Sequence, residues 1–228
     1  MITRRGYDEL CRADVVITDR LAPVELLDDL AEGVEVISVG KVPRTPSISQ
    51  EEINALLIDR ALAGKRVVRL KGGDSFVFGR GAEEVLACEA AGIEVDVVPG
   101  VTSAVAVPEI AGIPLTHRSV TQGFTVVSAH VPPSDPRSTV DWAALARART
   151  TLVLMMGVHT LPEVSAALIE GGMNPLTPAA IIQDGGLPTQ RLLTSALGTI
   201  GRMAAVNDFH PPAIVVVGDV VEWRNATE

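Results

Sequence analysis

Short aliphatic runs alternate with stretches of helical spacing along the chain. In the first half, the aliphatic runs predict buried strands over residues 14–18, 34–39, 66–70 and 95–98. Apolar side chains recur at helical spacing over residues 50–63, and Ser49 with Glu52 forms a capping box where this helix starts. Residues 82–91 predict a second helix, and a glycine follows each of the two. Strands and helices in alternation indicate parallel crossover connections and therefore an α/β fold.

The alternation pauses over residues 112–123, where two glycines, a proline and polar residues predict a linker. A second series of aliphatic runs follows, and it predicts strands over residues 124–129, 151–156, 178–182, 191–194 and 213–218. Helices are expected between these strands, over residues 142–147, 161–169 and 197–205. We therefore predict two α/β domains, residues 1–117 and 118–228.

Composition narrows the class of protein. Hydrophobic residues make up 47% of the 228 residues but aromatic residues only 3%, so the cores must consist of aliphatic side chains, as buried parallel strands do. The net charge of -9 argues against a nucleic-acid partner, because phosphate binding needs a basic surface. No apolar run reaches the roughly 18 residues of a membrane span, and the first residues lack a signal-peptide pattern. We expect a cytoplasmic protein that has no membrane partner.

The common nucleotide-binding and nucleophile motifs are absent from the chain. No Gly-x-Gly-x-x-Gly opens a helix after a strand, and there is neither a phosphate loop nor a Gly-x-Ser-x-Gly elbow. The four histidines lack helical pair spacing with carboxylates, and Cys11 and Cys88 lack metal-ligand spacing to a histidine. We expect free thiols and no metal site.

A glycine-rich loop directly follows the predicted strand over residues 66–70. Ligands of open α/β sheets bind just past such strand ends, where Gly72 and Gly73 would let the backbone approach a ligand closely. Asp74 could accept a hydrogen bond from an amine or hydroxyl of that ligand. In the plainer alternative, Asp74 caps an ordinary turn between strand and helix. The additional glycines up to Gly81 favour the ligand-binding interpretation.

Two further groups of polar residues follow predicted strands. Thr102 and Ser103 come after the strand over residues 95–98 and can begin a helix whose N-terminus faces a ligand, although capping alone explains them equally well. Asp19 and Lys41 each follow a strand end and would lie on the same rim as the glycine loop. A carboxylate and an ammonium there could transfer protons, and surface roles explain them equally well.

Taken together, these segments resemble the tetrapyrrole methylase family, and most closely its uroporphyrinogen-III C-methyltransferase branch. The resemblance extends over most of the chain and is carried above all by RVVRLKGGDSFVFGRG (66–81), VVPGVTSA (97–104), GIPLTHR (112–118) and PPAIVVVGDVV (211–221). It implies a two-domain α/β architecture with S-adenosylmethionine in the cleft between the domains, and it also implies a homodimer. No metal is implied, because the sulfonium methyl group is already activated.

The resemblance also implies an activity and roles for particular residues. The implied reaction is the methylation of uroporphyrinogen III to precorrin-2, on the way to sirohaem and cobalamin. Asp19 and Lys41 match the proton-handling pair of the family. The implied donor contacts are Gly72, Gly73, Asp74, Val77, Thr102, Ser103, Met156, Gly185 and Ala213. For the carboxylate-rich substrate, the candidate ligands are Arg20, Arg44, Arg80 and Arg118.

The start of the chain departs from the family pattern. Relatives begin with a strand and a Gly-x-Gly-Pro-Gly-Asp-Pro loop before a Leu-Thr-x-x-Gly helix start, whereas residues 2–6 match only that helix start. We therefore expect the first strand and its loop to be missing from the first domain. Buried backbone groups that lose their partners cost about 1–3 kcal/mol each. A start assigned too late is the favoured explanation, and a shortened or degenerate paralogue that binds the donor or a tetrapyrrole without turnover is the alternative. A methylase of another tetrapyrrole is a further alternative.

Overall fold

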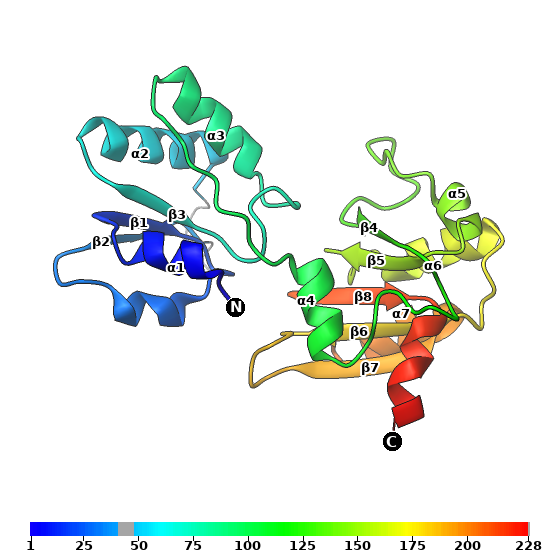
Figure 1. The fold of residues 1–228 in the computed structure, drawn as a ribbon. Coiled ribbons are helices and arrows are strands. Elements are labelled where there is room, and N and C mark those ends of the chain that lie inside the picture. Colours follow the sequence, from blue (N-terminus) through cyan, green and yellow to red (C-terminus); the bar gives the residue numbers. More distant parts are fainter. Residues whose placement is uncertain (41–47, 228) are drawn as a thin grey trace. The chain divides into compact units, whose positions relative to one another are not determined.

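The structure is a computed structural model that describes residues 1–40 and 48–227, with side chains described up to residue 223. It contains two compact units, Met1–Thr102 and Ser103–Glu228, and each combines helices with a β-sheet (Figure 1). The predicted α/β fold class is confirmed. Because each unit has its own sheet and its own core, the two are described separately.

The first unit has a three-stranded sheet in the order β2-β1-β3, and both strand pairs are parallel. Val16 at its centre lies opposite Val36 on one side and Val68 on the other. The strands are β1 (Val15–Thr18), β2 (Glu35–Ser38) and β3 (Val67–Leu70). The helices are α1 (Arg4–Leu10), the 3-10 helix η1 (Val24–Asp29), α2 (Gln50–Leu62) and α3 (Gly81–Ala90). The parallel crossovers expected for this half are confirmed.

Helix α2 begins at the predicted capping box. The Ser49 hydroxyl accepts a hydrogen bond from the Glu52 N–H at 3.2 Å, and the Glu52 carboxylate accepts one from the Ser49 N–H at 2.6 Å. The bond from the Ser49 backbone holds the pKa of the Glu52 carboxyl below its usual value. Ile53 and Leu57 then pack with buried residues of β1, so the helix covers one face of the sheet.

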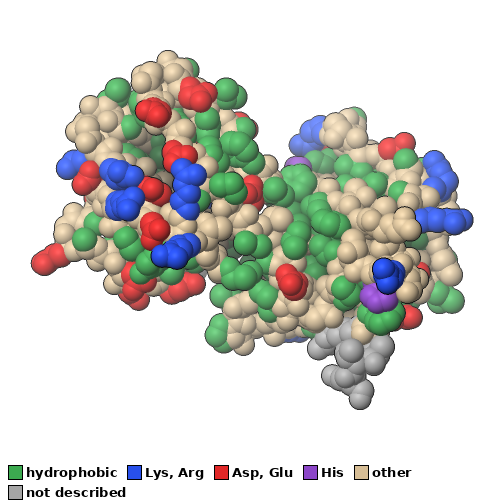
Figure 2. All heavy atoms as spheres, in the orientation of Figure 1, with side chains coloured by type: hydrophobic (Ala, Val, Ile, Leu, Met, Phe, Trp, Pro, Cys, Tyr) green, Lys and Arg blue, Asp and Glu red, His purple; other side chains and the backbone are tan. Residues whose placement is uncertain are grey.

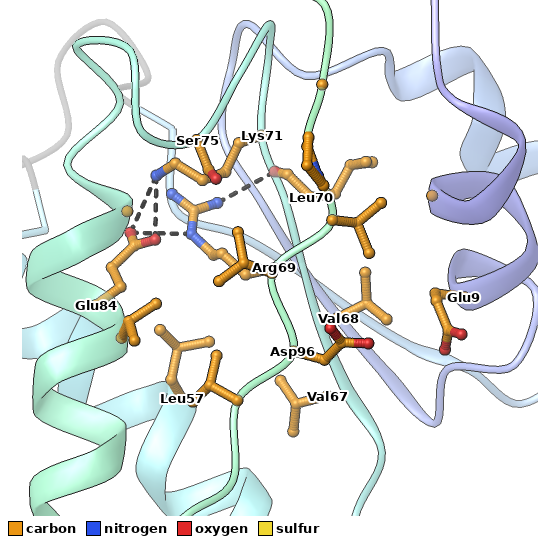
Figure 3. A pocket seen from close by; sticks show the side chains of 18 of the residues that line it. Glu9, Leu57, Val67, Val68, Arg69, Leu70, Lys71, Ser75, Glu84 and Asp96 are labelled. Atoms are coloured by element: carbon orange, nitrogen blue, oxygen red, sulfur yellow. Dashed lines mark hydrogen bonds and ion pairs between the residues drawn. The ribbon is translucent and has the colours of Figure 1, made fainter.

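The strand predicted over residues 95–98 is absent from the structure. Residues 93–102 form neither strand nor helix, and within the described part of the chain no backbone–backbone hydrogen bond involves residues 94–98. A cavity of about 590 Å³ is lined both by this segment and by all of β3 (Figure 3). A strand forms only when a neighbouring strand lies about 4.8 Å away. Here β3 and residues 93–98 both line the cavity, and they do not pair with each other. The prediction was wrong because an aliphatic pattern does not supply the pairing partner.

The second unit has a five-stranded mixed sheet in the order β4-β5-β8-β6-β7. β4 and β5 are parallel, and the other neighbouring pairs are antiparallel. The strands are β4 (Phe124–Ser128), β5 (Thr151–Met155), β6 (Pro178–Gln183), β7 (Arg191–Ala196) and β8 (Ala213–Val217). The helices are α4 (Ser103–Ile110), α5 (Trp142–Arg147), α6 (Leu161–Glu170), α7 (Leu197–Val206) and the 3-10 helix η2 (Asp219–Thr227). All five strands predicted for this half are confirmed.

Helices cover both faces of the second sheet. Leu154 and Val215 belong to the core on the side of α5, α6 and α7, whereas their neighbours Val153 and Val216 belong to the core on the side of α4. Alternate residues of β5 and β8 therefore point to opposite faces, as the pleat of a strand requires. Because both faces are covered, the central strands consist of continuous aliphatic residues, although the sheet is mixed.

The units divide earlier in the chain than the sequence predicted. The expected boundary lay near residue 118, whereas the structure divides between Thr102 and Ser103. Val107 of α4 and Ile113, in the segment expected to be a linker, are buried in the core of the second sheet. The glycine and proline content of residues 112–123 therefore indicates a packed loop within the second unit.

Candidate functional site

The loops at the carboxyl edge of the first sheet pack backbone against backbone. A Cβ atom on Gly72 would lie 2.3 Å from the carbonyl oxygen of Leu21, in the loop after β1. A Cβ atom on Gly100 would lie 2.0 Å from the carbonyl oxygen of Gly73. Neither carbonyl belongs to a side chain that could move aside, so only glycine fits at these two positions. The glycines predicted to approach a ligand thus also hold three loops together.

Asp74 connects two of these loops through its carboxylate. One oxygen accepts a hydrogen bond from the Phe76 N–H at 2.9 Å, and the other accepts one from the Gly100 N–H at 3.0 Å. The turn that the sequence offered as the plainer alternative is therefore present, and Asp74 additionally fixes the loop that contains Gly100. A direct contact between Asp74 and a methyl donor remains a prediction.

Asp19 lies at the same edge and belongs to a cluster of charged side chains. Its Oδ2 accepts a hydrogen bond from Arg69 Nη2 at 3.2 Å. Arg69 Nε in turn donates to Glu84 Oε1 at 3.2 Å, and Lys71 Nζ donates to the two Glu84 oxygens at 3.2 and 3.1 Å. Figure 3 shows Arg69, Lys71 and Glu84 converging from β3, the residue after it and α3.

Sequence reasoning missed Arg69, Lys71 and Glu84. The available signal was the pattern of residues 67–71, in which one cation interrupts and another directly follows an otherwise aliphatic strand. In the structure these cations are largely buried, and burial lowers the pKa of the Lys71 ammonium, with a further lowering by the positive charge of Arg69. Glu84 opposes that shift. Buried charges persist only where they are paired, and these form a balanced set.

Three of the candidate donor contacts gather at one edge of the second sheet. Met156 directly follows β5, and Gly185 lies two residues after the end of β6. Ala213 begins the antiparallel strand β8 and pairs with the last residue of β6. Met156 has a φ of +59° and is 47% exposed. A left-handed backbone and an exposed apolar side chain at a strand end are typical of a ligand-binding edge.

Helix α4 borders this edge of the second sheet. A Cβ atom on Gly185 would lie 2.4 Å from Cγ1 of Val107, so the glycine lets the loop after β6 pack against the helix. Thr102 and Ser103 are half-buried where α4 begins. In the first unit, the remaining donor candidate Val77 is half-buried in the glycine-rich loop.

The candidate substrate ligands are divided between the two units. Arg20 and Arg80 are exposed in the first unit, whereas Arg118 is exposed in the second. Arg80 forms hydrogen bonds of 2.9 and 3.2 Å with Glu83, which raise the pKa of its guanidinium. On the visible face of the first unit, basic side chains lie among acidic ones (Figure 2). Lys41 and Arg44 lie outside the described residues.

The described part of the chain contains neither a candidate metal cluster nor a membrane-spanning helix. No group of three or more His, Cys, Asp or Glu side chains there is arranged to hold a metal ion. Among the described helices, none has the length and apolar character that crossing a membrane requires.

The fold and the candidate site together identify the class of protein. It is a two-domain α/β enzyme whose candidate residues lie at the ends of strands. The chain belongs to the tetrapyrrole (corrin/porphyrin) methylase family, whose family model matches residues 1–201. It is 43% identical over 222 residues to a uroporphyrinogen-III C-methyltransferase of Methanocaldococcus jannaschii, covering 97% of this chain and 91% of the relative. It is 42% identical over 224 residues to a siroheme synthase of Thiobacillus denitrificans, covering 98% of this chain and 46% of the relative.

The chain thus spans about half the length of the siroheme synthase that it matches. Among solved structures, it resembles a uroporphyrin-III C-methyl transferase of Thermus thermophilus complexed with S-adenyl homocysteine, with 36% identity and a TM-score of 0.80. That likeness covers 97% of this chain and 92% of the other. A cobalt precorrin-4 methyltransferase shares the fold, with 24% identity, a TM-score of 0.85 and coverage of 96% and 89%.

Proposed function

We propose that the chain transfers methyl groups from S-adenosylmethionine to carbon atoms of uroporphyrinogen III, which gives precorrin-2 for sirohaem or cobalamin synthesis. Its membership of the methylase family and its identity of more than 40% to a named uroporphyrinogen-III C-methyltransferase support this function. The observation that carries it is the carboxyl edge of the first sheet. There, Asp19 is held by Arg69 beside the glycine-rich loop, where a proton acceptor and a ligand loop would have to lie together.

The residues of both edges fit the proposed methyl donor. The donor has apolar and polar parts, and at one edge of its sheet the second unit offers both the exposed Met156 side chain and the backbone groups around Gly185. The first unit offers the loop of Gly72 and Gly73. Because glycine has no side chain, the donor can come close to the backbone of this loop. When bound, the donor supplies an electrophilic methyl group on a positively charged sulfur. We propose that the donor contacts are those inferred from the sequence. Asp74 contributes to donor binding by holding together the two loops that its carboxylate connects.

The proton of each methylation has a candidate acceptor in Asp19. A new carbon–carbon bond forms at the pyrrole carbon, the sulfur–methyl bond breaks, and one proton must leave the substrate. Asp19 Oδ2 is engaged by Arg69, and Oδ1 accepts only the Leu21 N–H at 3.3 Å among the described residues. A carboxylate oxygen has two lone pairs, so Oδ1 retains one for the substrate proton. Positioned general bases contribute about 10²- to 10⁴-fold to a rate.

The substrate is an anion with many carboxylates, and exposed arginines are suited to it because the guanidinium binds a carboxylate in a fork. We propose Arg20, Arg80 and Arg118 for this role, together with Arg44. Arg80 would have to exchange its Glu83 partner for a substrate carboxylate. That exchange is feasible because both side chains of the Arg80–Glu83 pair are more than half exposed, and such pairs contribute little to stability.

The proposed function is tested by incubating the full chain with uroporphyrinogen III and labelled S-adenosylmethionine under anaerobic conditions. The expected product carries two transferred methyl groups by mass spectrometry. Donor binding in calorimetry without any transferred label would instead support the non-catalytic alternative. One observation favours that alternative: residues 94–98 line the cavity beside β3, and among the described residues their backbone groups make no backbone–backbone hydrogen bond. Transfer to other tetrapyrroles but not to uroporphyrinogen III would identify a different substrate.

We also propose a homodimer in the cytoplasm, as the resemblance implies. Light scattering after size-exclusion chromatography should give about twice the chain mass of 24.0 kDa. A single-chain mass at micromolar concentration would exclude the dimer.

A further inference from the structure

The charged cluster behind Asp19 extends from the carboxyl edge into the interior of the first unit. The exposed fraction of the side chain is 30% for Asp19 but only 13% for Arg69, 11% for Lys71 and 6% for Glu84. Four charges that balance to zero are thus arranged with the Asp19 carboxylate the most exposed and its counterparts buried. Figure 3 shows the three buried members, Arg69, Lys71 and Glu84. This arrangement differs from an exposed ion pair, because a buried charge interacts strongly with its neighbours.

The guanidinium of Arg69 is fixed by four acceptors. Nη1 donates to the carbonyl oxygens of Ile17 and Leu70 at 3.2 Å each, Nε donates to Glu84, and Nη2 donates to Asp19. The guanidinium is a rigid planar fork, so these partners determine both its plane and the direction of Nη2. Asp19 Oδ2 is consequently held in one place, and the orientation of Oδ1 follows from it.

Glu84 is the point at which the cluster is anchored. It accepts hydrogen bonds from Arg69, from Lys71 and, at 3.3 Å, from Gln50 of α2. Among the described residues, the charged groups that face Asp19 are therefore Arg69 directly, with Lys71 and Glu84 behind it, and Gln50 is neutral. Without the charge of Glu84, two buried cations would act on Asp19 unopposed.

We propose that Arg69 and Glu84 are positioning residues for the methyl transfer. Arg69 orients Asp19 so that its free oxygen can take the substrate proton, and Glu84 balances the two cations so that Asp19 remains able to accept it. This inference rests on the proposed function, in which Asp19 touches the substrate and neither Arg69 nor Glu84 does.

The test compares pH–rate profiles of the full chain with those of Arg69→Met, Arg69→Lys and Glu84→Gln. Loss of a cation near Asp19 should move the acidic limb of the profile to higher pH, and loss of the Glu84 charge should move it to lower pH, each by about one unit. Arg69→Met should also lower kcat about 10- to 100-fold, since misorientation removes part of the general-base contribution. Arg69→Lys keeps the positive charge but loses the forked geometry of the guanidinium. The acidic limb of its profile should therefore stay at the same pH while kcat falls.

Matched controls are Glu35→Gln and Arg60→Met, which break an exposed pair of the same kind at 2.9 Å in the same unit. They should leave both the rate and the limb unchanged. Breaking a buried pair is strongly destabilising, so circular dichroism must first confirm that each variant is folded. If Arg69→Met does not fold, the conservative variants Arg69→Lys and Glu84→Gln carry the test.

The failure of this inference is distinguishable from failure of the proposed function. If the unaltered chain transfers methyl groups but the variants lose activity without the opposite shifts of the limb, Arg69 and Glu84 are merely structural and the inference is overturned. If the unaltered chain transfers none, the proposed function fails first. The Asp19 carboxyl resonance, assigned in ¹³C-labelled protein through Asp19→Asn, then decides: its chemical shift at neutral pH should change in Arg69→Met and stay unaltered in Arg60→Met, and an unaltered shift in Arg69→Met refutes the inference.

Discussion

The two sheets consist of similar aliphatic strands but are enclosed to different extents. In the second unit, β5, β6 and β8 are buried along nearly their whole length, and helices cover both faces. In the first unit only β1 is buried throughout, whereas β2 is mostly exposed and most of β3 is half-buried beside the cavity of about 590 Å³. The difference lies in what surrounds the strands, because their aliphatic sequences are alike.

The comparison indicates a division of roles between the units. The second unit gains stability from apolar area removed from water, at roughly 25 cal/mol per Å². The first unit uses part of its interior for Arg69, Lys71 and Glu84, whose burial carries a desolvation cost. Its loops are then fixed by glycine contacts and by hydrogen bonds such as those of Asp74. We expect the second unit to be the more stable and the first to be the more sensitive in activity.

The largest effect is expected from glycines at the two edges. In Gly100→Ala the new methyl group meets the fixed carbonyl of Gly73, whereas in Gly185→Ala it meets Val107, whose two γ carbons and Cβ all lie within 3.0 Å, so that helix α4 has to shift. A misplacement of about 1 Å at an active site can lower a rate 10²-fold, so Gly100→Ala should reduce methyl transfer at least that much. Gly185→Ala should cost about 1–3 kcal/mol in stability through overpacking and leave more activity.

Gly123→Ala is the control for these two variants, because its Cβ atom would lie an ordinary 3.5 Å from Thr150. Rates of transfer and urea unfolding of all three variants give the comparison. A Gly100→Ala protein as active as the Gly123→Ala protein would show that the backbone contact of the first edge is dispensable.

A smaller difference is expected between two valines in the sheets. Val216 is fully buried in β8, and Val68 is half-buried in β3 beside the cavity. Val216→Ala removes two buried carbon atoms and should lower the free energy of unfolding by about 2 kcal/mol, at roughly 0.8 kcal/mol per carbon plus the new cavity. Val68→Ala should cost less than about 1 kcal/mol, because the site is already open. Equal costs in denaturant titrations would contradict the contrast between the sheets.

Hydrogen exchange tests the same contrast without any mutation. β8 has a hydrogen-bonded neighbour on each side, whereas β1 is the one strand that pairs with β3 in the described part of the chain. Alternate amides of β3 should therefore exchange faster than any amide in the middle of β8, since exposed backbone groups open with little free energy. Slow exchange throughout β3 and residues 94–98 would indicate that a partner closes this edge in solution.

The smallest effect concerns Tyr7, the one tyrosine of the chain. Hydrogen bonds to Cys11 and to Asp29 raise the pKa of its phenol to about 12, with the bond to Cys11 as the larger cause. Because the pKa is raised, the phenol favours the folded state fully below pH 10, and this contribution is lost as the pH rises toward 12. Absorbance at alkaline pH should show the late titration, and Cys11→Ala should shift it toward the ordinary value. Titration near pH 10 in the folded protein would show that polar contacts do not hold α1 in this way.

The sequence predicted the strands of the second half of the chain better than those of the first half. Each predicted strand of the second half is present, since every one of them finds a neighbour. Residues 95–98 have the same aliphatic pattern as β3 but form no strand, because β propensity describes fit to a sheet that must first exist. The predicted boundary near residue 118 differs from the observed division after Thr102 for a related reason. Glycine and proline indicate a turn, but whether that turn packs on a core depends on residues such as Ile113.

The candidate site was partly predictable for physical reasons. Parallel strand ends share one edge, so the positions of Asp19 and Gly72 followed from the order of strands and loops. The role of Glu84 could not follow, because its contact with Arg69 joins α3 to β3 across 15 residues and depends on how the helix packs. The same holds for Asp74, whose link to Gly100 connects loops 26 residues apart.

The proposal that Asp19 accepts the substrate proton is tested most directly by comparing carboxylates at the two ends of one strand. Asp19 follows β1 at the carboxyl edge, and Asp14 precedes it at the opposite edge, where it accepts the Arg66 N–H at 2.8 Å. Asp19→Asn should bind S-adenosylmethionine normally but transfer its methyl group to uroporphyrinogen III at least about 100-fold more slowly in a single turnover. Asp14→Asn should react at the unaltered rate. Equal single-turnover rates for Asp19→Asn and the unaltered chain would show that Asp19 does not accept the substrate proton.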